Sequence, residues 1–448
     1  MLWNYYIDKY DIFFTIFYTF FIVLGGYFYQ QKKIKTDYRY KYFFPGLIIK
    51  LFGGLAFGLI YQFYYRGGDT SAYFYNAKLF AEVLFENPKA YFIMLFQDAQ
   101  SFHPDTYDYT ERLFYFRNPE SWFMVKLTNF VALFGAIRYY PTTLIFSLLS
   151  YTGLWKIYLI FTYLFQYVKA KYFAIFILFV PSVVFWGSGI MKDTVCITAL
   201  GFLFYEWVSI VKFKKRGLQH FLWIILASYI ILRLKAYIII TFVPSLLFWL
   251  YLEQKNRIRN VKIRLIIAPF IFVVIVGSSL FAVYNLMQMS DFYRIDTIQN
   301  RIEGFHSWHG QLAQTQGQSG YDLGEIEYTP TGILRKFIPA VIVGLFRPFL
   351  VEVRNPVQLF AALENTIYLL VFFYLLFKTK IFGFLKLLKF DSLVYISIIF
   401  SILFAFVVGF TSYNFGALVR YKIPLLPFFG GALAVMWQLV RAKRVQNI

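Results

Sequence analysis

Long apolar runs separated by short polar stretches dominate this chain of 448 residues. Several runs of about 20 residues lack charged side chains, and each is long enough to span the hydrocarbon core of a bilayer. The pattern predicts an all-α, polytopic bundle of transmembrane helices forming one membrane domain, 1–448. We expect about eleven spans, at 12–30, 44–63, 141–166, 172–189, 194–211, 218–233, 236–252, 265–287, 358–377, 391–411 and 421–440.

Basic residues between the runs predict which side each loop faces. Lys and Arg gather at 31–43, 168–171, 212–217, 255–264, 378–389 and the C-terminus. The positive-inside rule assigns these stretches to the cytoplasm. Segment 65–120 holds eight acids against five Lys or Arg and is predicted to be external, as is the polar segment 288–334. The N-terminus is then outside and the C-terminus inside.

Two apolar segments, 121–137 and 337–350, do not fit as spans, because either one crossing alone would place the following basic loops outside. We expect both to lie on or partly in the outer face, where non-spanning backbone is tolerated if protein buries it. The alternative is that both cross and part of the topology is inverted. The first external loop, 65–137, therefore carries amphipathic surface helices, and the second, 288–357, a re-entrant or surface helix.

Composition agrees with a membrane protein, since 59% of residues are hydrophobic and only 15% are charged. The net charge of +21 comes mostly from the basic clusters between spans, so we expect the lipid bilayer as partner and no nucleic acid. The single cysteine, Cys196, excludes an internal disulfide. No cleavable signal peptide is visible, and the Ile- and Lys-rich usage is typical of a bacterium of low genomic GC content. The predicted location is the bacterial inner membrane.

Cations occupy external turns that the positive-inside rule should deplete of them. Charges at membrane boundaries are expensive, which makes each a functional hypothesis. Together they would suit a phosphate or pyrophosphate head group, because Arg offers a bidentate fork and Lys a point charge. The alternative for each is a snorkelling side chain that anchors a helix end. The predicted substrate-binding cations are Arg66, Lys192, Arg233, Lys235, Arg347 and Arg420.

Two acids are the candidate catalytic residues. Asp69 follows Gly67 and Gly68, which let the backbone turn sharply and approach a ligand. Asp69 would act as a general base or a metal ligand, with capping of the following helix as the alternative. Asp193 has the same alternatives. His306 and His309 are too few for a zinc site, so no metal site is predicted, and a divalent cation is left open as a cofactor.

Short motifs in this order resemble the membrane glycosyltransferases of the C superfamily, including polysaccharide (O-antigen or exopolysaccharide) polymerase-like members. "GGDTSAYFYNAKLF" resembles their first external loop, in which Asp69, Tyr73 and Ala77 match the pattern. "PESWFMVKLTNFVALFGAIRYYPTTLIFSLLS" resembles their surface helix and the span after it. "VPSVVFWGSGIMKDTV" and "NFGALVRYKIPLLPFF" resemble two of their external turns.

The resemblance implies a glycosyltransferase C-like fold, a polyprenyl-linked sugar donor and chemistry at the outer membrane face. It implies that Asp69 is the base or an acid that binds substrate, that Tyr73 belongs to the binding site, and that the cationic turns hold the lipid phosphate. The chain departs from the pattern by an additional N-terminal helix. O-antigen-type polymerases often depend more on external arginines, so the role of Asp69 stays open.

Three classes of function follow from these observations. The first is a hexosyltransferase or polymerase that transfers a glycan from a polyprenyl-(di)phosphate to a glycan or lipid-linked acceptor in cell-envelope polysaccharide biosynthesis. Cations would stabilise the leaving phosphate by preorganised charge. The second is a transporter or flippase for a lipid-linked or anionic substrate, although we find no internal repeat of the kind transporters often carry. The third is an assembly component of an envelope machine, which needs no cations on one face.

Overall fold

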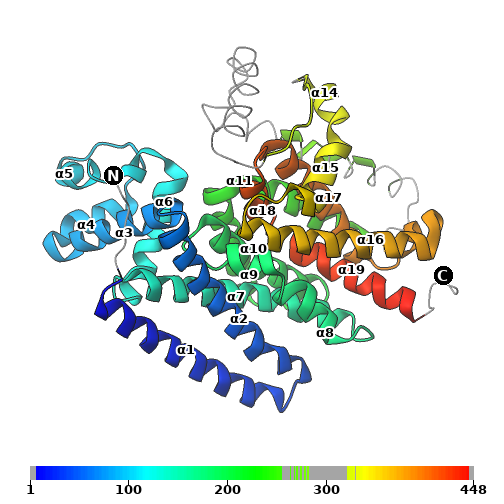
Figure 1. Cartoon of the computed structure of the whole chain (residues 1–448), viewed down its shortest axis with the longest axis horizontal. Coiled ribbons are helices and arrows are strands. Elements are labelled where there is room, and N and C mark those ends of the chain that lie inside the picture. Colours follow the sequence, from blue (N-terminus) through cyan, green and yellow to red (C-terminus); the bar gives the residue numbers. More distant parts are fainter. Residues whose placement is uncertain are drawn as a thin grey trace. The chain divides into compact units, whose positions relative to one another are not determined.

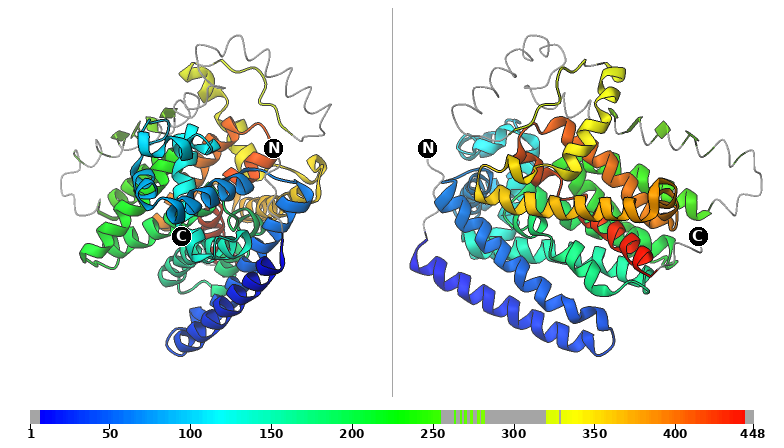
Figure 2. Two further views of the ribbon diagram at one scale, coloured as in Figure 1. Left: turned by 90° about the vertical axis from the view of Figure 1, so that its left-hand side faces the viewer. Right: turned by 45° about the vertical axis from the view of Figure 1, so that its right-hand side comes forward.

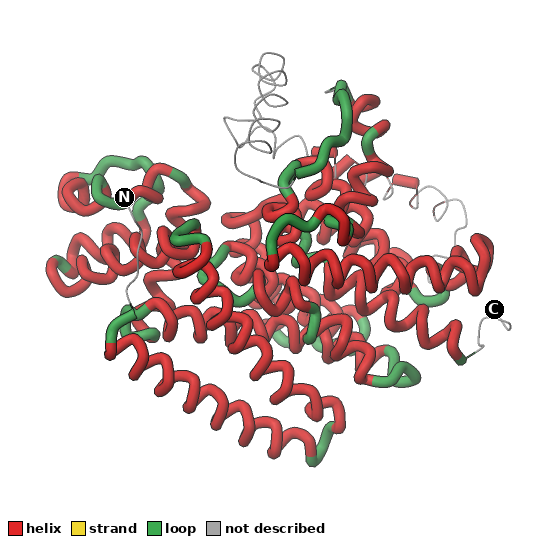
Figure 3. The backbone as a smooth tube through the Cα atoms, in the orientation of Figure 1, coloured by secondary structure: helices red, strands yellow, loops and turns green. Residues whose placement is uncertain are grey.

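The structure is a computed structural model. It describes residues 7–254, 320–327 and 329–442, with a few positions between 263 and 281. Within these residues the chain is helical throughout, with loops between helices and no named strand (Figure 3). The one β-like pairing in this part of the chain is an isolated bridge between Gly320 and Asn414. The predicted all-α class is therefore confirmed.

The helices follow the chain in the order given below, and Figure 1 labels the α-helices among them. They are α1 (Lys9–Ile34), η1 (Tyr38–Tyr42), α2 (Phe43–Leu59), η2 (Ile60–Tyr64), α3 (Asp69–Glu86), α4 (Pro88–Phe96), η3 (Pro104–Thr106), α5 (Tyr107–Thr110), η4 (Phe114–Arg117), α6 (Pro119–Phe134), α7 (Tyr139–Leu164), α8 (Ala170–Phe173), η5 (Ala174–Leu178), α9 (Pro181–Trp186), α10 (Lys192–Val211), α11 (Leu218–Gln254), α14 (Pro330–Arg335), α15 (Phe337–Phe346), η7 (Leu350–Glu352), α16 (Pro356–Leu388), α17 (Ser392–Thr411), α18 (Phe415–Tyr421) and α19 (Leu426–Arg441).

Seven helices in the described part of the chain are long and apolar enough to cross a membrane, or eight if α18 and α19, bent by 69°, count as one broken span. Long apolar helices in this number are typical of a multi-pass membrane protein. Six of the seven, namely α1, α2 with its flanking turns, α7, α10, α16 and α17, correspond to single predicted spans. The seventh is α11.

The difference from eleven spans arises at three places. The spans predicted at 218–233 and 236–252 correspond to two helices that meet at a kink at Lys235 and share the label α11. They count as one long apolar helix among the seven, and the side that the kink faces stays a prediction. The segment 172–189 is divided among α8, the π-helical η5 and α9. The span predicted at 265–287 lies outside the described residues, apart from scattered positions.

The chain divides into two compact units, and each is described by itself. Unit 1 is Met1–Thr162 with Val183–Lys235, and unit 2 is Tyr163–Ser182 with Ala236–Ile448. The sequence passes from one unit to the other three times, so neither unit is a continuous stretch of chain. A single membrane domain, as the sequence predicts, remains a prediction.

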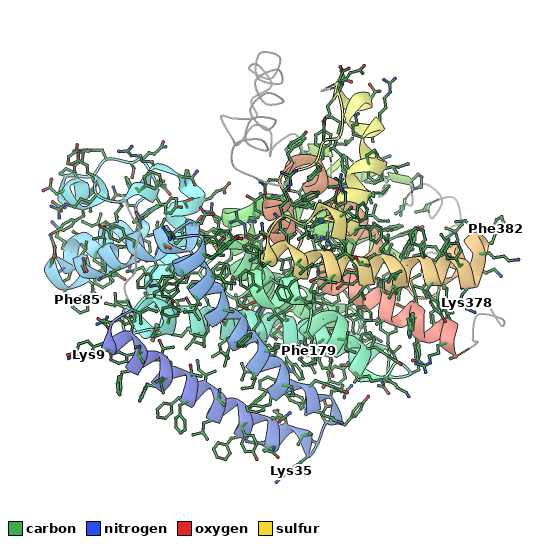
Figure 4. All side chains as sticks on the ribbon, viewed as in Figure 1. Lys9, Lys35, Phe85, Phe179, Lys378 and Phe382 are labelled. Carbon is green, nitrogen blue, oxygen red and sulfur yellow. The ribbon has the colours of Figure 1, made fainter. Side chains whose placement is uncertain are left out.

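Unit 1 has two ends, one at each end of α1. Helices α1 and α2 form an antiparallel hairpin (Figure 2), and Lys9 and Lys35 mark the two ends of α1 in Figure 4. At one end Arg138, before α7, binds Asp8, before α1, at 2.8 Å. The Asp11 backbone N–H and the Arg138 guanidinium lower the pKa of Asp8 to about 2. We call this end, which also carries segment 65–138, the loop end.

Segment 65–138 folds as a small helical layer in which α3 packs on both α4 and α6. Asn129 of α6 donates to the Ala77 carbonyl of α3 at 3.1 Å and accepts from the Tyr91 hydroxyl of α4 at 2.7 Å. The Tyr18 hydroxyl of α1 donates to the Phe134 carbonyl, so the end of α6 lies beside α1. With 16 residues, α6 is too short to be a span, and α15 has only 10. Both lengths agree with the predicted surface helices.

Close glycine packing sets the register of α2 within unit 1. A Cβ atom on Gly53 would overlap the Val184 carbonyl, whereas a Cβ on Gly25 of α1 would meet nothing within 4 Å. In unit 2, α17 packs on α15 and α19, and Gly409 of α17 similarly approaches the Ala340 backbone of α15. Small residues at such contacts are typical of helices that pack in membranes.

Replacing Gly53 with alanine should destabilise unit 1 by about 1–3 kcal/mol, because the added methyl overpacks backbone that cannot move aside. The matched control is Gly25→Ala, which adds the same methyl to an open helix position and should leave stability unchanged or slightly higher. Thermal unfolding of both purified variants in one detergent measures the difference. Equal melting temperatures for the two variants would contradict the packing described here.

Candidate functional site

A sharp turn brings the chain from α2 and η2 into α3. Arg66, Gly67 and Gly68 have φ angles of 55°, 137° and 122°, three successive values that favour glycine over other residues. A Cβ on Gly68 would lie 2.9 Å from the Tyr61 ring of η2, so Gly68 is also required by the close approach. The two glycines thus return the chain over η2, and Arg66 is left exposed.

Asp69 is the first residue of α3 and is half-buried beside a pair of tyrosines. The Tyr115 hydroxyl lies 3.5 Å from Asp69 Oδ1, and the Tyr73 ring stacks on the Tyr115 ring at 4.7 Å between centroids. The N-cap of α3 is Gly68, and Asp69 follows it in the first turn of the helix, where a negative charge is favoured.

The segment between α9 and α10, predicted as an external turn, is buried by the protein around it. Gly187–Met191 are all buried, and Gly189 packs on the Phe57 ring of α2. Backbone carbonyls of α9 and of this segment accept hydrogen bonds from side chains. Lys50 Nζ donates to Val183 O at 2.7 Å, and Ser147 Oγ donates to Ser188 O at 2.8 Å. Such donors are needed because irregular backbone at membrane depth must be satisfied by protein.

Lys50 is a residue that sequence reasoning missed. It lies in the middle of the apolar run 44–63, and its side chain is completely buried. An intramembrane lysine is by default a functional hypothesis with a partner to be named. Its position inside a predicted span was the available signal, but the Val183 carbonyl could not be assigned from sequence.

Lys192 and Asp193 begin α10, and each is paired with a distant charge. Lys235 Nζ lies 2.5 Å from Asp193 Oδ1, and these side chains are only 9% and 1% exposed. Lys192 Nζ lies 3.1 Å from Glu120 Oε2 in the first turn of α6. The N-cap of α10 is Met191, and Asp193 lies in the first turn of the helix. Asp193 neutralises Lys235 at the kink of α11.

The first half of α6 lies against the same part of α11. The Arg233 guanidinium is 5.6 Å from the Phe123 ring, and the Tyr229 ring meets Phe123 edge to face at 5.8 Å. Arg233 itself is exposed. Lys126, one turn further along α6, donates to the Leu95 and Gln97 carbonyls, and burial lowers the pKa of Lys126.

Aromatic rings connect the Asp69 turn with the buried segment that leads into α10. Tyr61, which touches Gly68, lies 6.3 Å from the Trp186 ring, and Phe57 lies 6.1 Å from the same ring. The start of α3 and the start of α10 are thus both at the loop end of unit 1. This end presents a half-buried carboxylate, two exposed arginines and the N-termini of two long helices.

Unit 2 contains the remaining predicted cations, Arg347 and Arg420. Arg347 forms a bidentate ion pair with Glu352, and its guanidinium lies 5.1 Å from the centre of the Phe415 ring. Lys422, also at this place, is fully buried and donates to Asn365 at 2.5 Å and to the Arg347 carbonyl at 3.2 Å. Arg420 donates to the Tyr421 hydroxyl at 3.3 Å. The predicted ring of six cations as a whole stays a prediction.

Charge pairing divides the predicted cations into two kinds. Lys192, Lys235 and Arg347 each bind a carboxylate of their own unit, so a phosphate would have to compete for them. Arg66 and Arg233 are exposed and better placed to meet a ligand. Within the described part of the chain no cluster of three or more His, Cys, Asp or Glu side chains could hold a metal ion. His306 and His309 lie outside the described residues.

Comparison with known proteins gives no match for this chain. No family model matches the chain, and neither a curated protein nor a solved structure matches it. The resemblance to the C superfamily of membrane glycosyltransferases therefore stays a prediction, carried by the short motifs around Asp69, Asp193 and Arg420.

Proposed function

We propose that the protein is an integral-membrane glycosyltransferase or polysaccharide polymerase. It would take a sugar or glycan linked to a polyprenyl (di)phosphate and transfer it at the outer face of a bacterial cytoplasmic membrane. The observation that carries the proposal is the Asp69 turn, where two glycines precede a half-buried carboxylate in the first turn of α3. Exposed Arg66 and stacked Tyr73 and Tyr115 accompany it.

In the proposed reaction an acceptor hydroxyl attacks the anomeric carbon of the donor. The new glycosidic bond forms, the bond from the anomeric carbon to the phosphate oxygen breaks, and the leaving phosphate keeps the electron pair. Asp69 takes the hydroxyl proton, which requires it to be within hydrogen-bond reach of the acceptor. Exposed Arg66 and Arg233 would stabilise the negative charge on the leaving group.

The paired residues have a supporting role in this proposal. Asp193 and Lys235 neutralise each other, so we assign them to fixing the α10 N-terminus against α11 and not to proton transfer. Lys192 and Glu120 tie α6 to α10 in the same way. The orientation is part of the proposal: the acid-containing loop end would face outward, and the basic stretch 31–43 at the other end of α1 would face the cytoplasm.

A transporter or flippase is the second candidate, and the buried segment 183–191 favours it. Broken helices with a charged residue at membrane depth are typical of transporter binding sites, and Lys50 beside Val183 has this form. The two candidates differ in the fate of the donor. A transferase breaks the sugar–phosphate bond, whereas a transporter moves the lipid-linked glycan intact. An assembly component would do neither.

The deciding experiment uses the purified full chain in vesicles. The vesicles also contain polyprenyl-diphosphate-linked glycan, which is isolated from cells of the source bacterium without the gene for this protein. Mass spectrometry measures the polyprenyl diphosphate released and the length of the glycan. Release with the wild type and none with Asp69→Asn supports the transferase. Glycan that reaches the opposite leaflet with its phosphate linkage intact would instead support transport. No change in linkage or in leaflet would contradict both.

A further inference from the structure

We propose that the start of α3 is a seat for a phosphate group, formed by first-turn backbone N–H groups, the Ser71 hydroxyl and Arg66. The inference rests on the proposed function and refines it, because it assigns the phosphate end of the donor to the Asp69 turn. The chemistry recognised is a phosphate, whether it belongs to a lipid-linked donor or is free in solution.

The first observation is that a glycine stands at the N-cap of α3. Its 18 residues follow Gly68, which has no side chain to accept from the first-turn N–H groups. The first N–H groups of a helix have no intrahelical partner, and together with the helix dipole they attract anions. The preceding glycine turn, with positive φ at Gly67 and Gly68, lets a ligand approach this end closely.

The second, independent observation is Ser71. Its side chain is 1% exposed, and its hydroxyl has no hydrogen-bond partner among the described residues. Helical side chains tilt toward the N-terminus, and the third helical position is the one whose side chain reaches back to the cap. A buried hydroxyl left without a partner calls for an explanation such as a ligand. The neighbouring Thr70 hydroxyl, by contrast, is bonded to Tyr139 at 2.9 Å.

The charges around the seat fit a leaving phosphate. Arg66, three residues before Asp69, is exposed and can offer two parallel N–H donors to phosphate oxygens. The Asp69 carboxylate in the same turn repels a bound phosphate, so ground-state binding is weakened while the base is held close to the leaving group. Removing the Asp69 charge should therefore strengthen phosphate binding even though it removes transfer activity.

Calorimetric titration of the purified full chain with phosphate and with pyrophosphate tests the seat. Ser71→Ala should weaken binding about 2- to 10-fold, and Arg66→Gln about tenfold. Matched controls are Ser150→Ala, a second completely buried serine without a partner, and Arg112→Gln, an exposed arginine of the same loop. Both controls should bind within twofold of the wild type. Asp69→Asn should bind several-fold more tightly.

A second arm identifies the source of the phosphate. The melting temperature of the wild type is compared in vesicles with and without polyprenyl phosphate, and with and without free phosphate. Protection by the lipid, by free phosphate or by both supports the seat if Ser71→Ala reduces it more than Ser150→Ala does. Absence of any phosphate binding, or equal effects of the two serine variants, overturns it, and Arg66→Gln decides alone if Ser71→Ala does not fold. Binding without glycan release would keep the seat and sink the transferase.

Discussion

Asp69→Asn is expected to lower the rate of glycosyl transfer by about 10²- to 10⁴-fold, the usual contribution of a positioned general base. The substitution keeps the size and shape of the side chain, so the fold should survive. Release of polyprenyl diphosphate by vesicle-bound protein measures the effect. Thermal unfolding of the same sample shows whether the variant is folded.

Two companion variants sharpen this test. Asp108→Asn removes an exposed acid from the same external loop and should transfer glycan at the wild-type rate. Asp69→Glu keeps the base but displaces it, so it should retain partial activity. Full activity of folded Asp69→Asn would contradict the assignment of Asp69 as base, and arginines alone would then have to account for catalysis.

Lys235→Met is expected to destabilise the protein by about 3–5 kcal/mol, because it leaves the Asp193 carboxylate buried without its counter-charge. Asp193→Asn should have a cost of similar size. The double variant Asp193→Asn/Lys235→Met removes both charges and should recover most of the loss. Chemical denaturation in mixed micelles, followed by circular dichroism, measures all three free energies of unfolding.

An exposed ion pair of the same protein provides the control. Lys89 and Asp105 lie 2.6 Å apart, but their side chains are 77% and 41% exposed. Solvent screening limits such a pair, so Lys89→Met should change stability by less than about 1 kcal/mol. If Lys235→Met cost no more than Lys89→Met, the buried pair would not be what fixes the kink of α11.

Most spans could be predicted because their signal is local. A continuous apolar run such as that of α17 or α1 must be a helix in a membrane, whatever surrounds it. Arg233 and Lys235 interrupt the apolar run of α11, and this local signal predicts two helices, which do meet at a kink at Lys235. The charge of Lys235 is paired with Asp193, 42 positions upstream. No local pattern shows such a distant partner, so this pairing could not be predicted.

The candidate site follows the same division. The turn at Asp69 could be predicted because two adjacent glycines are a local signal of unusual backbone geometry. The helix after this turn runs from Asp69 to Glu86. The carboxylates that engage Lys192 and Lys235 could not be predicted, since pairing between helices depends on packing. Lys50 was missed for that reason too.

The length of α1 makes its tilt sensitive to the thickness of the bilayer. It is 26 residues long, or about 39 Å, against a hydrocarbon core of about 30 Å. None of its most apolar window is buried by protein, and hydrogen bonds hold it near its start, through Asp8, and near its end, through Gln30. Acyl chains must cover the rings between, so a thinner membrane acts first on the tilt of α1. A change of lipid composition that tilts α1 therefore acts on Arg138, which binds Asp8 at the start of α1 and leads into α7.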